Sequence, residues 1–256
     1  MYSPAVRARA LLLLDQGLSL SEVSRRTGVN RSTLRTWRQD PDRTSPMTGV
    51  CARCVEPPRL PEPCDAYAYL LGLYLGDGCL SPVGDLAKGV WAMRIICADA
   101  WPGLMRECER ALRAVRPTNR VRASRRPGSH EISSYSKHWP HMFPQHGPGK
   151  KHHRAIMLQP WQEEVARMHP GPLVRGLMHS DGYRGLNRVR RELPGGVRWY
   201  EYPRYLFKNE SADILRICGE ALDRLGVAWR YSKRNEISVA RREAVALLDC
   251  HVGPKA

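Results

Sequence analysis

Two aspartates, Asp77 and Asp181, each end an apolar stretch and directly precede a glycine. The stretches read LLGLYLGDG at 70–78 and LVRGLMHSDG at 173–182. A carboxylate at the end of an apolar segment needs water, a cationic partner or a metal ion. Two carboxylates side by side repel each other unless a cation lies between them, and oxygen ligands of this kind suit Mg²⁺. The pair therefore predicts a magnesium site, provided that the fold brings both residues together.

Small residues at helical spacing precede both aspartates. Gly72 and Gly76 lie four positions apart in the first stretch, and Gly176 and Ser180 lie four apart in the second. Residues at this spacing share one face of a helix. Small side chains on such a face let two helix backbones approach closely. We expect two motif helices that pack face to face through these four residues, with Asp77 and Asp181 side by side at their ends.

The elements that must position the aspartates form an internal repeat. EISSYSKHWPHMFPQHGPGK at 131–150 aligns with EISVARREAVALLDCHVGPK at 236–255, at an offset of 105 residues. MRECERALRAV at 105–115 aligns with LRICGEALDRL at 215–225, at an offset of 110 residues. Together with the two aspartate-containing stretches, these are three pairs of matching blocks in the same order. They indicate two copies of one supersecondary unit. Each copy reads as a motif helix, two strands, an amphipathic helix, two strands and a last helix.

This paired pattern resembles the LAGLIDADG homing-endonuclease family over residues 65–256. The resemblance implies an α+β fold in which tandem αββαββα repeats form a pseudo-symmetric DNA-binding saddle within one monomeric chain. It also implies metal-dependent hydrolysis of phosphodiester bonds in double-stranded DNA. In that interpretation Asp77 and Asp181 bind Mg²⁺, together with the glycines that follow them, Gly78 and Gly182.

The resemblance implies further site residues. A lysine after the last helix of each copy lies near the site in this family, and Lys150 and Lys255 occupy that place, with Lys151 as a substitute. A polar residue where a strand meets the second helix orients water, and the offset of 110 places Asp99 and Asn209 there. Solvent-exposed tail lysines are the alternative for the lysine pair.

Two functions fit the motifs. The first is a sequence-specific, Mg²⁺-dependent endonuclease. The second is a non-cleaving transcription regulator, because some bacterial regulators carry a LAGLIDADG domain behind a helix-turn-helix. Retention of both aspartates favours the nuclease, whereas Arg175 and His179 inside the second motif depart from the family pattern.

The charge of the chain indicates a nucleic-acid partner. Lysine and arginine number 41 against 25 acids, which gives a net charge of +16. Residues two apart line one face of a strand, and arginine forks suit phosphates and base edges. The residues that we expect to contact DNA from the strands are Arg94, Arg120, Arg122, Arg184, Arg188, Arg190, Arg198, Tyr200, Tyr202 and Arg204.

The front of the chain has the spacing of a helix-turn-helix. Residues 4–16 are predicted to be helical, Ser19 or Ser21 to cap a second helix, and Gly28 to end it. Val23, Val29, Leu34 and Trp37 are expected to share a small core with Leu12–Leu14. The third helix then enters the major groove. Its expected contacts with DNA come from Arg31, Ser32, Thr33, Arg35 and Arg38.

We predict four segments: a helix-turn-helix domain at 1–42, a proline-rich linker at 43–64, and the two repeats at 65–155 and 156–256. Cys51 and Cys54 in the linker have the spacing of zinc ligands, but a structural Zn²⁺ needs four ligands, so free thiols are the alternative. No apolar run is long enough to span a membrane, and a cytoplasmic, nucleoid-associated protein is expected.

Overall fold

The computed structural model describes residues 4–39, 61–85 and 88–255. The chain divides into two compact units, Met1–Ala52 and Arg53–Ala256. Among the described helices, none combines the length and the apolar character that crossing a membrane requires.

The front unit contains three helices, α1 (Pro4–Asp15), α2 (Leu20–Thr27) and α3 (Arg31–Gln39). The Ser19 side chain caps α2 by accepting a hydrogen bond of 3.2 Å from the backbone N–H of Glu22. Helix α2 ends at Gly28, whose φ of +69° is in the left-handed region that glycine adopts freely. This arrangement of α2, turn and α3 is the predicted helix-turn-helix.

The small core of the front unit differs from the prediction at one leucine. Val23, Val29 and Leu34 are buried together with Ala10, and Leu13, Leu14 and Trp37 pack against them. Leu12, in contrast, is 58% exposed, so its predicted place in the core was wrong. At 3.6 residues per turn, one helix cannot point all of a leucine run toward the same core.

The large unit contains the two predicted repeats. Its first repeat consists of α4 (Cys64–Leu75), β1 (Gly78–Pro82), β2 (Trp91–Ala98), α5 (Pro102–Val115), β3 (Val121–Arg126), β4 (Ser129–Ser136) and α6 (Trp139–Met142). Its second repeat consists of α8 (Pro170–Asp181), β5 (Gly182–Leu193), β6 (Gly196–Lys208), α9 (Ala212–Arg224), β7 (Arg230–Lys233), β8 (Glu236–Val239) and α10 (Arg242–Val252).

Each repeat forms one antiparallel four-stranded sheet. The strand order is β1-β2-β4-β3 in the first sheet and β5-β6-β8-β7 in the second, so the two repeats share one topology. The predicted α+β fold of tandem αββαββα repeats is confirmed.

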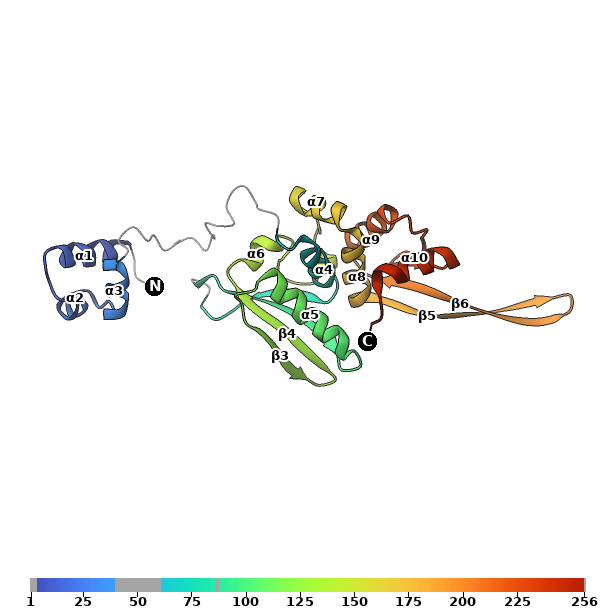
Figure 1. Cartoon of the computed structure of the whole chain (residues 1–256), viewed down its shortest axis with the longest axis horizontal. Helices are drawn as coiled ribbons and strands as arrows, with labels where there is room; N and C mark the ends of the chain where they lie inside the picture. The colour runs from blue at the N-terminus through green and yellow to red at the C-terminus, as the bar shows by residue number, and fades with distance from the viewer. Residues whose placement is uncertain (1–3, 40–60, 86–87, 256) are drawn as a thin grey trace. The chain divides into compact units, whose positions relative to one another are not determined.

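The repeats differ in three places. Strands β5 and β6 have 12 and 13 residues, against 5 and 8 in β1 and β2. They form a long two-stranded ribbon that projects beyond the helices of its own repeat (Figure 1). Helix α6 has four residues against eleven in α10, because Pro144 disfavours helical backbone at the preceding residue, Phe143. An additional helix, α7 (Pro160–Met168), connects the repeats.

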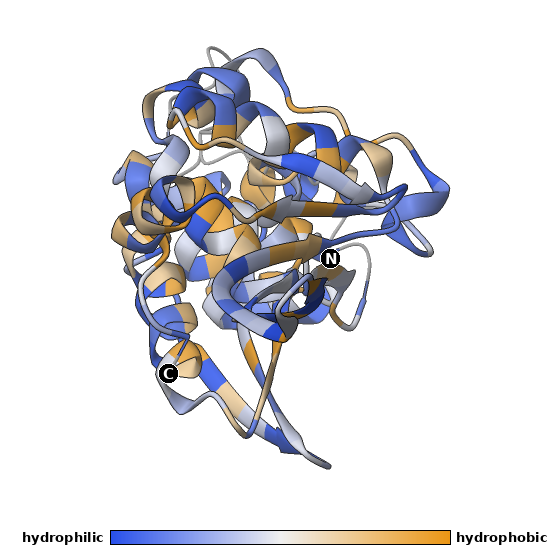
Figure 2. Ribbon diagram, turned by 90° about the vertical axis from the view of Figure 1, so that its right-hand side faces the viewer, coloured by the Kyte–Doolittle hydropathy of each residue, from blue (hydrophilic) through white to orange (hydrophobic). Residues whose placement is uncertain are grey.

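The motif helices α4 and α8 lie side by side at the centre of the large unit, with a sheet on either side (Figure 1). Residues Tyr67–Leu75 of α4 are all buried, as expected for a helix that is apolar around its whole circumference. Hydrophobic residues, in orange, and hydrophilic residues, in blue, occur on both the helices and the strands (Figure 2). In β2, Met93, Ile95 and Cys97 are buried and Ile96 between them is exposed, because successive side chains of a strand point to opposite faces of the sheet. One face of each sheet therefore packs against the helices and the other is open.

Candidate active site

The motif helices touch backbone to backbone through two glycines. A Cβ added to Gly72 would lie 2.7 Å from the backbone N of Leu177 and 2.8 Å from the Cα of Gly176. A Cβ added to Gly176 would lie 2.9 Å from the Cα of Gly72 and the backbone N of Leu73. Real Cβ atoms are not found this close to backbone atoms, so only glycine fits at either position. The structure thus brings the two glycines together at the crossing.

The crossing continues toward the aspartates. A Cβ on Gly76 would overlap the side chain of Ser180 and lie 3.1 Å from Oδ2 of Asp181. The Ser180 hydroxyl turns back onto its own helix and donates to the carbonyls of Gly176 and Leu177, at 3.1 and 2.9 Å. The end of α4 is therefore in contact with the end of α8, where Asp181 lies.

Gly78 and Gly182 make equivalent tight turns after the two aspartates. A Cβ on Gly78 would lie 2.5 Å from the Cα of Tyr74, and a Cβ on Gly182 would lie 2.5 Å from the carbonyl oxygen of Met178. Each glycine lets the chain fold against its own motif helix as the next strand begins. Both glycines therefore have a steric function, and the metal contact that the sequence predicted for them stays a prediction.

The charge of Asp181 acts on the Asp77 carboxylate. Solvent reaches Asp77, yet its pKa is raised to about 6, first because neighbouring protein removes hydration and second because of the charge of Asp181. Loss of hydration also raises the pKa of Asp181, which is half-buried. Opposing this, Asn209 donates a hydrogen bond of 2.7 Å to Oδ2 of Asp181. The predicted polar residue thus contacts the acid in the second repeat.

Asp99, the counterpart of Asn209 in the first repeat, is bound elsewhere. Its Oδ1 lies 2.8 Å from Nδ1 of His130. The two repeats therefore support their acids differently, through an amide beside Asp181 and without that contact beside Asp77.

A lysine from each repeat reaches the carbonyl end of its motif helix. Lys151 donates to the carbonyls of Tyr74, of Leu75 at 3.1 Å and of Gly76 at 2.6 Å. Lys255 donates to the carbonyl of Ser180 at 3.2 Å. Burial lowers the pKa of Lys151 to about 8 and also lowers the pKa of Lys255.

Lys150, which the repeat alignment placed near the site, has an exposed side chain and lines the same cavity as Lys151. Lys151, the substitute of the sequence interpretation, is the lysine bonded to the helix end.

Each lysine acts mainly on the acid of the other repeat. For the pKa of Asp77, Lys255 is the stronger of the two lowering charges, followed by Lys151. For Asp181 the order is reversed, with Lys151 ahead of Lys255. The four charged groups therefore form one electrostatic cluster shared by both repeats.

A cavity of about 470 Å³ opens beside this cluster. Its walls include Gly76, Asp181 and Asn209, and they add Lys208, which the sequence patterns did not single out. Within the described ranges, no group of three or more His, Cys, Asp or Glu side chains could hold a metal ion. Cys51 and Cys54 lie outside the described residues.

The arginines of the long ribbon lie on opposite faces. Arg188 and Arg190 stand opposite Glu201 and Trp199, so they share the face on which Tyr205 and Phe207 are buried farther along the strand. The other face of β6 carries Arg198, Tyr200, Tyr202 and Arg204. Arg191 also lies on this second face, 5.8 Å from the Tyr200 ring. It is not among the residues that the sequence predicted to contact DNA, because only the strand register shows which residues share its face.

Several predicted DNA-contacting arginines already hold acidic partners. Arg184 donates two hydrogen bonds of 2.7 Å to Asp249. Arg94 lies 3.3 Å from Glu131. Arg120 and Arg122 are exposed, and Arg122 lies over the ring of Tyr135 at 5.4 Å.

Helix α3 presents an open polar face in the front unit. Arg31, Ser32, Arg35 and Arg38 are exposed, and Thr33 is half-buried. Leu34, between them, points into the small core.

Comparison with known proteins gives relatives for both units. Residues 1–44 match the family model of a homeodomain-like domain. No curated protein matches the sequence. Solved structures of the homing endonuclease I-DmoI are similar at 15% identity and a TM-score of 0.48. A mesophilic variant covers 75% of this chain and 91% of its own, and a complex with DNA and Mn covers 75% and 98%.

The LAGLIDADG meganuclease I-AabMI, bound to uncleaved DNA, is similar at 10% identity and a TM-score of 0.46, covering 72% of this chain and 83% of its own. At these identities the likeness is one of fold. The chain is similar to LAGLIDADG homing endonucleases over three quarters of its length and to homeodomain-like domains at its front.

Proposed function

We propose that the protein is a monomeric, sequence-specific endonuclease that hydrolyses phosphodiester bonds of double-stranded DNA with Mg²⁺, as homing endonucleases do. The observation that carries the proposal is the convergence of Asp77 and Asp181 at the ends of two helices that cross on glycine. The two repeats contribute one acid each, and loss of hydration together with the charge of Asp181 raises the pKa of Asp77 to about 6.

The residues present fit a divalent cation. Two carboxylates whose ionisation is disfavoured are stabilised when a cation lies between them. Mg²⁺ is commonly held by one or two carboxylates, with substrate phosphates and water as its other ligands. The two acids are therefore sufficient as protein ligands. A bound metal would supply the activated water and neutralise charge on the phosphate.

The neighbouring residues prepare the site. Asn209 fixes the orientation of the Asp181 carboxylate through the 2.7 Å hydrogen bond. Lys151 and Lys255 hold ammonium groups at the ends of the motif helices. Positive charge placed there stabilises negative charge that develops on a phosphate.

DNA contact is assigned to the open sheet faces and to α3. The face of β6 that carries Arg198, Tyr200, Tyr202 and Arg204 is turned away from the helices, as a groove-contacting surface requires. In the front domain, residues 1–42, α3 presents Arg31 and Arg35 for the major groove. Residues 43–64 connect this domain to the repeats at 65–155 and 156–256.

The test is a selection with random double-stranded DNA, with and without Mg²⁺, in which bound and cut products are sequenced. We expect cleavage at one sequence only with Mg²⁺, and its loss in Asp77→Asn and Asp181→Asn. Asp65→Asn is the matched control, because Asp65 is an exposed acid at the opposite end of α4. Specific binding without cleavage under all conditions would reject the nuclease.

A second candidate is a DNA-binding transcription regulator on the same scaffold. The favouring observation is that the charges of Lys151 and Lys255 lower the pKa of both acids. The two lysines thus partly neutralise the charge of the acids without any metal. A protein that binds DNA but does not cleave it would require such neutralisation. Specific binding that is insensitive to Mg²⁺ is the expected result for this candidate.

A further inference from the structure

A buried polar chain crosses between the motif helices near the active site. The hydroxyl of Tyr69 on α4 lies 2.9 Å from Nδ1 of His179 on α8. On its other side, Nε2 of His179 lies 3.1 Å from the carbonyl oxygen of Val252, the last residue of α10. His179 is 1% exposed and Tyr69 is 6% exposed. A polar side chain buried to this extent needs both of its contacts.

The partners determine which atoms carry the protons. A backbone carbonyl only accepts hydrogen bonds, so Nε2 of His179 donates to Val252. Nδ1 is then the acceptor of the neutral imidazole, and the Tyr69 hydroxyl donates to it.

The carbonyl held by His179 begins the segment that carries Lys255. Gly253 has a φ of +67° and turns the chain after α10. Two residues later, Lys255 donates to the carbonyl of Ser180, the neighbour of His179 in sequence. Consecutive residues of α8 therefore hold both ends of the segment 252–255.

The first repeat holds its lysine segment by other means. The offset of 104 between the motifs places Leu75 opposite His179, and Leu75 is a buried apolar residue. There, Arg154 binds the segment before Lys151, donating to the carbonyls of Gln145, Pro148 and Gly149 at 3.2, 3.2 and 3.0 Å. The second repeat has His179 where the first has leucine, and it has the bond to Val252 that leucine cannot make.

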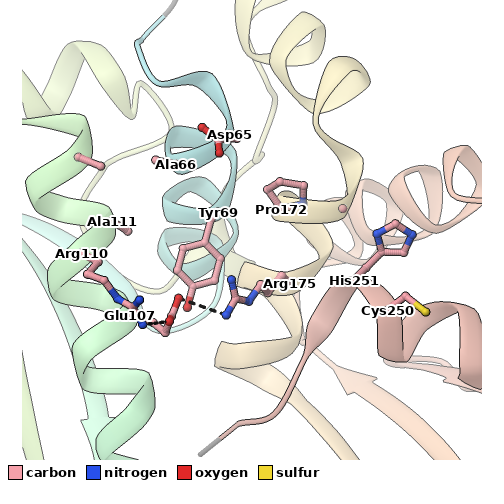
Figure 3. A pocket seen from close by; sticks show the side chains of 12 residues that line it. Asp65, Ala66, Tyr69, Glu107, Arg110, Ala111, Pro172, Arg175, Cys250 and His251 are labelled. Carbon is pink, nitrogen blue, oxygen red and sulfur yellow. Dashed lines mark hydrogen bonds and ion pairs between the residues drawn. The ribbon is translucent and has the colours of Figure 1, made fainter.

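Arg175, four residues before His179 on α8, also contacts Tyr69. The guanidinium of Arg175 lies 5.2 Å from its ring centroid and 3.2 Å from a carboxylate oxygen of Glu107 on α5. Figure 3 shows these three side chains together at a cavity of about 350 Å³. Both departures of the second motif from the family pattern, Arg175 and His179, thus belong to one arrangement around Tyr69.

We infer that His179 is a positioning residue that fixes Lys255 at the paired aspartates by holding the carbonyl of Val252. Tyr69 keeps the imidazole in the tautomer that donates to Val252. The inference rests on the proposed function for the catalytic value of Lys255, but the placement of Lys255 can be measured without cleavage.

The experiment uses the full-length protein and two readouts. The first is the acetylation rate of each lysine by an N-hydroxysuccinimide ester of acetic acid, followed by mass spectrometry, with Lys151 as internal control. The second is the kcat and KM of DNA cleavage. In His179→Leu we expect Lys255 to react several-fold faster while Lys151 is unchanged. We also expect kcat to fall roughly 10- to 100-fold, with little change in KM, since misplacing a catalytic group has costs of this size.

Two further variants separate positioning from packing. His179→Gln keeps a donor near the place of Nε2 and should restore both readouts, whereas His179→Asn should not. If His179→Leu does not fold cooperatively, the Gln–Asn comparison and Tyr69→Phe carry the test. Equal Lys255 reactivity in folded Gln and Asn variants and the wild type would overturn the inference. Altered Lys255 reactivity in the variants, combined with a wild-type protein that never cuts DNA, would instead leave the inference standing and reject the proposed function.

Discussion

The Cα of Gly176 lies 2.8 Å from the point at which a side chain on Gly72 would begin. The two motif helices are thus separated by no side chain at their crossing. Everything at the site depends on this separation, because Asp77 lies two residues after the end of α4 and Asp181 is the last residue of α8.

Adding one methyl group at the crossing of the motif helices should strongly destabilise the protein. In Gly72→Ala the new carbon would meet backbone atoms of α8, which cannot move as a flexible side chain can. Overpacking of this kind costs about 3 kcal/mol of unfolding free energy, measured by urea denaturation. Gly195→Ala is the control, because a Cβ there meets nothing within 4 Å. Equal stability of the two variants would argue against the close crossing.

The raised pKa of Asp77 predicts pH-dependent stability. Its pKa is about 6 in the folded protein, above the ordinary value near 4. The charged carboxylate therefore destabilises the fold above pH 6, and this penalty disappears as the pH falls below about 4. In metal-free buffer, Asp77→Asn should stabilise the protein by about 1 kcal/mol near pH 8, after allowance for solvent screening. The gain should vanish near pH 4, and a gain that did not depend on pH would contradict this account.

The two adjacent lysines should differ in importance. Lys151 bonds the end of α4, whereas Lys150 is exposed. Lys151→Met should lower kcat for DNA cleavage roughly 100-fold, the usual cost of removing a preorganised charge, and Lys150→Met should change it less than about twofold. Because the pKa of Lys151 is about 8, its contribution should also be lost as the pH rises through that value. A larger loss of kcat in Lys150→Met than in Lys151→Met would instead favour Lys150, the lysine that the repeat alignment selected.

The two faces of the ribbon should contribute unequally to DNA binding. Arg198→Ala removes a charge from the face turned away from the helices, and it should weaken binding and reduce the salt slope by about one. Arg188→Ala, on the opposite face, is the matched control and should change neither. Affinity measured between low and moderate salt tests both variants. Similar losses in the two would mean that the ribbon contacts DNA edge-on.

The front domain should add affinity to the repeats. Removing residues 1–45 deletes α3 with its exposed arginines, so DNA binding should weaken and its salt dependence should decrease. Cleavage by residues 46–256 should persist at high protein concentration, because both acids remain. Unchanged affinity would assign α3 a function other than DNA contact.

In the large unit, the features that could be predicted from sequence are those that depend on repetition. Asp77 and Asp181 occur in matching blocks, and a duplicated unit brings equivalent residues together about its own axis. The order of helices and strands along each repeat followed for the same reason. Asn209 could be located because the offset of 110 residues that aligns the second helices of the two copies also applies to the residues just before those helices.

The features that could not be predicted are those in which the repeats differ. Helix α7 has no counterpart in the first block, so no comparison revealed it. An alignment by fixed offset selected Lys150, although a shift of one residue brings Lys151 to the carbonyls of α4. Partners such as Asp249 for Arg184 depend on packing between distant elements, and no local pattern contains that information.

The unequal length of the ribbons has a consequence for the DNA target. Strand β5 exceeds β1 by seven residues, from 12 against 5, which corresponds to roughly 23 Å of additional reach. Along B-form DNA this is a distance of about seven base-pair steps. A palindromic DNA site has two equal halves, whereas the strand pairs β1–β2 and β5–β6 that would contact them differ in length. The preferred target should therefore be asymmetric, with a longer information-bearing flank under the second repeat.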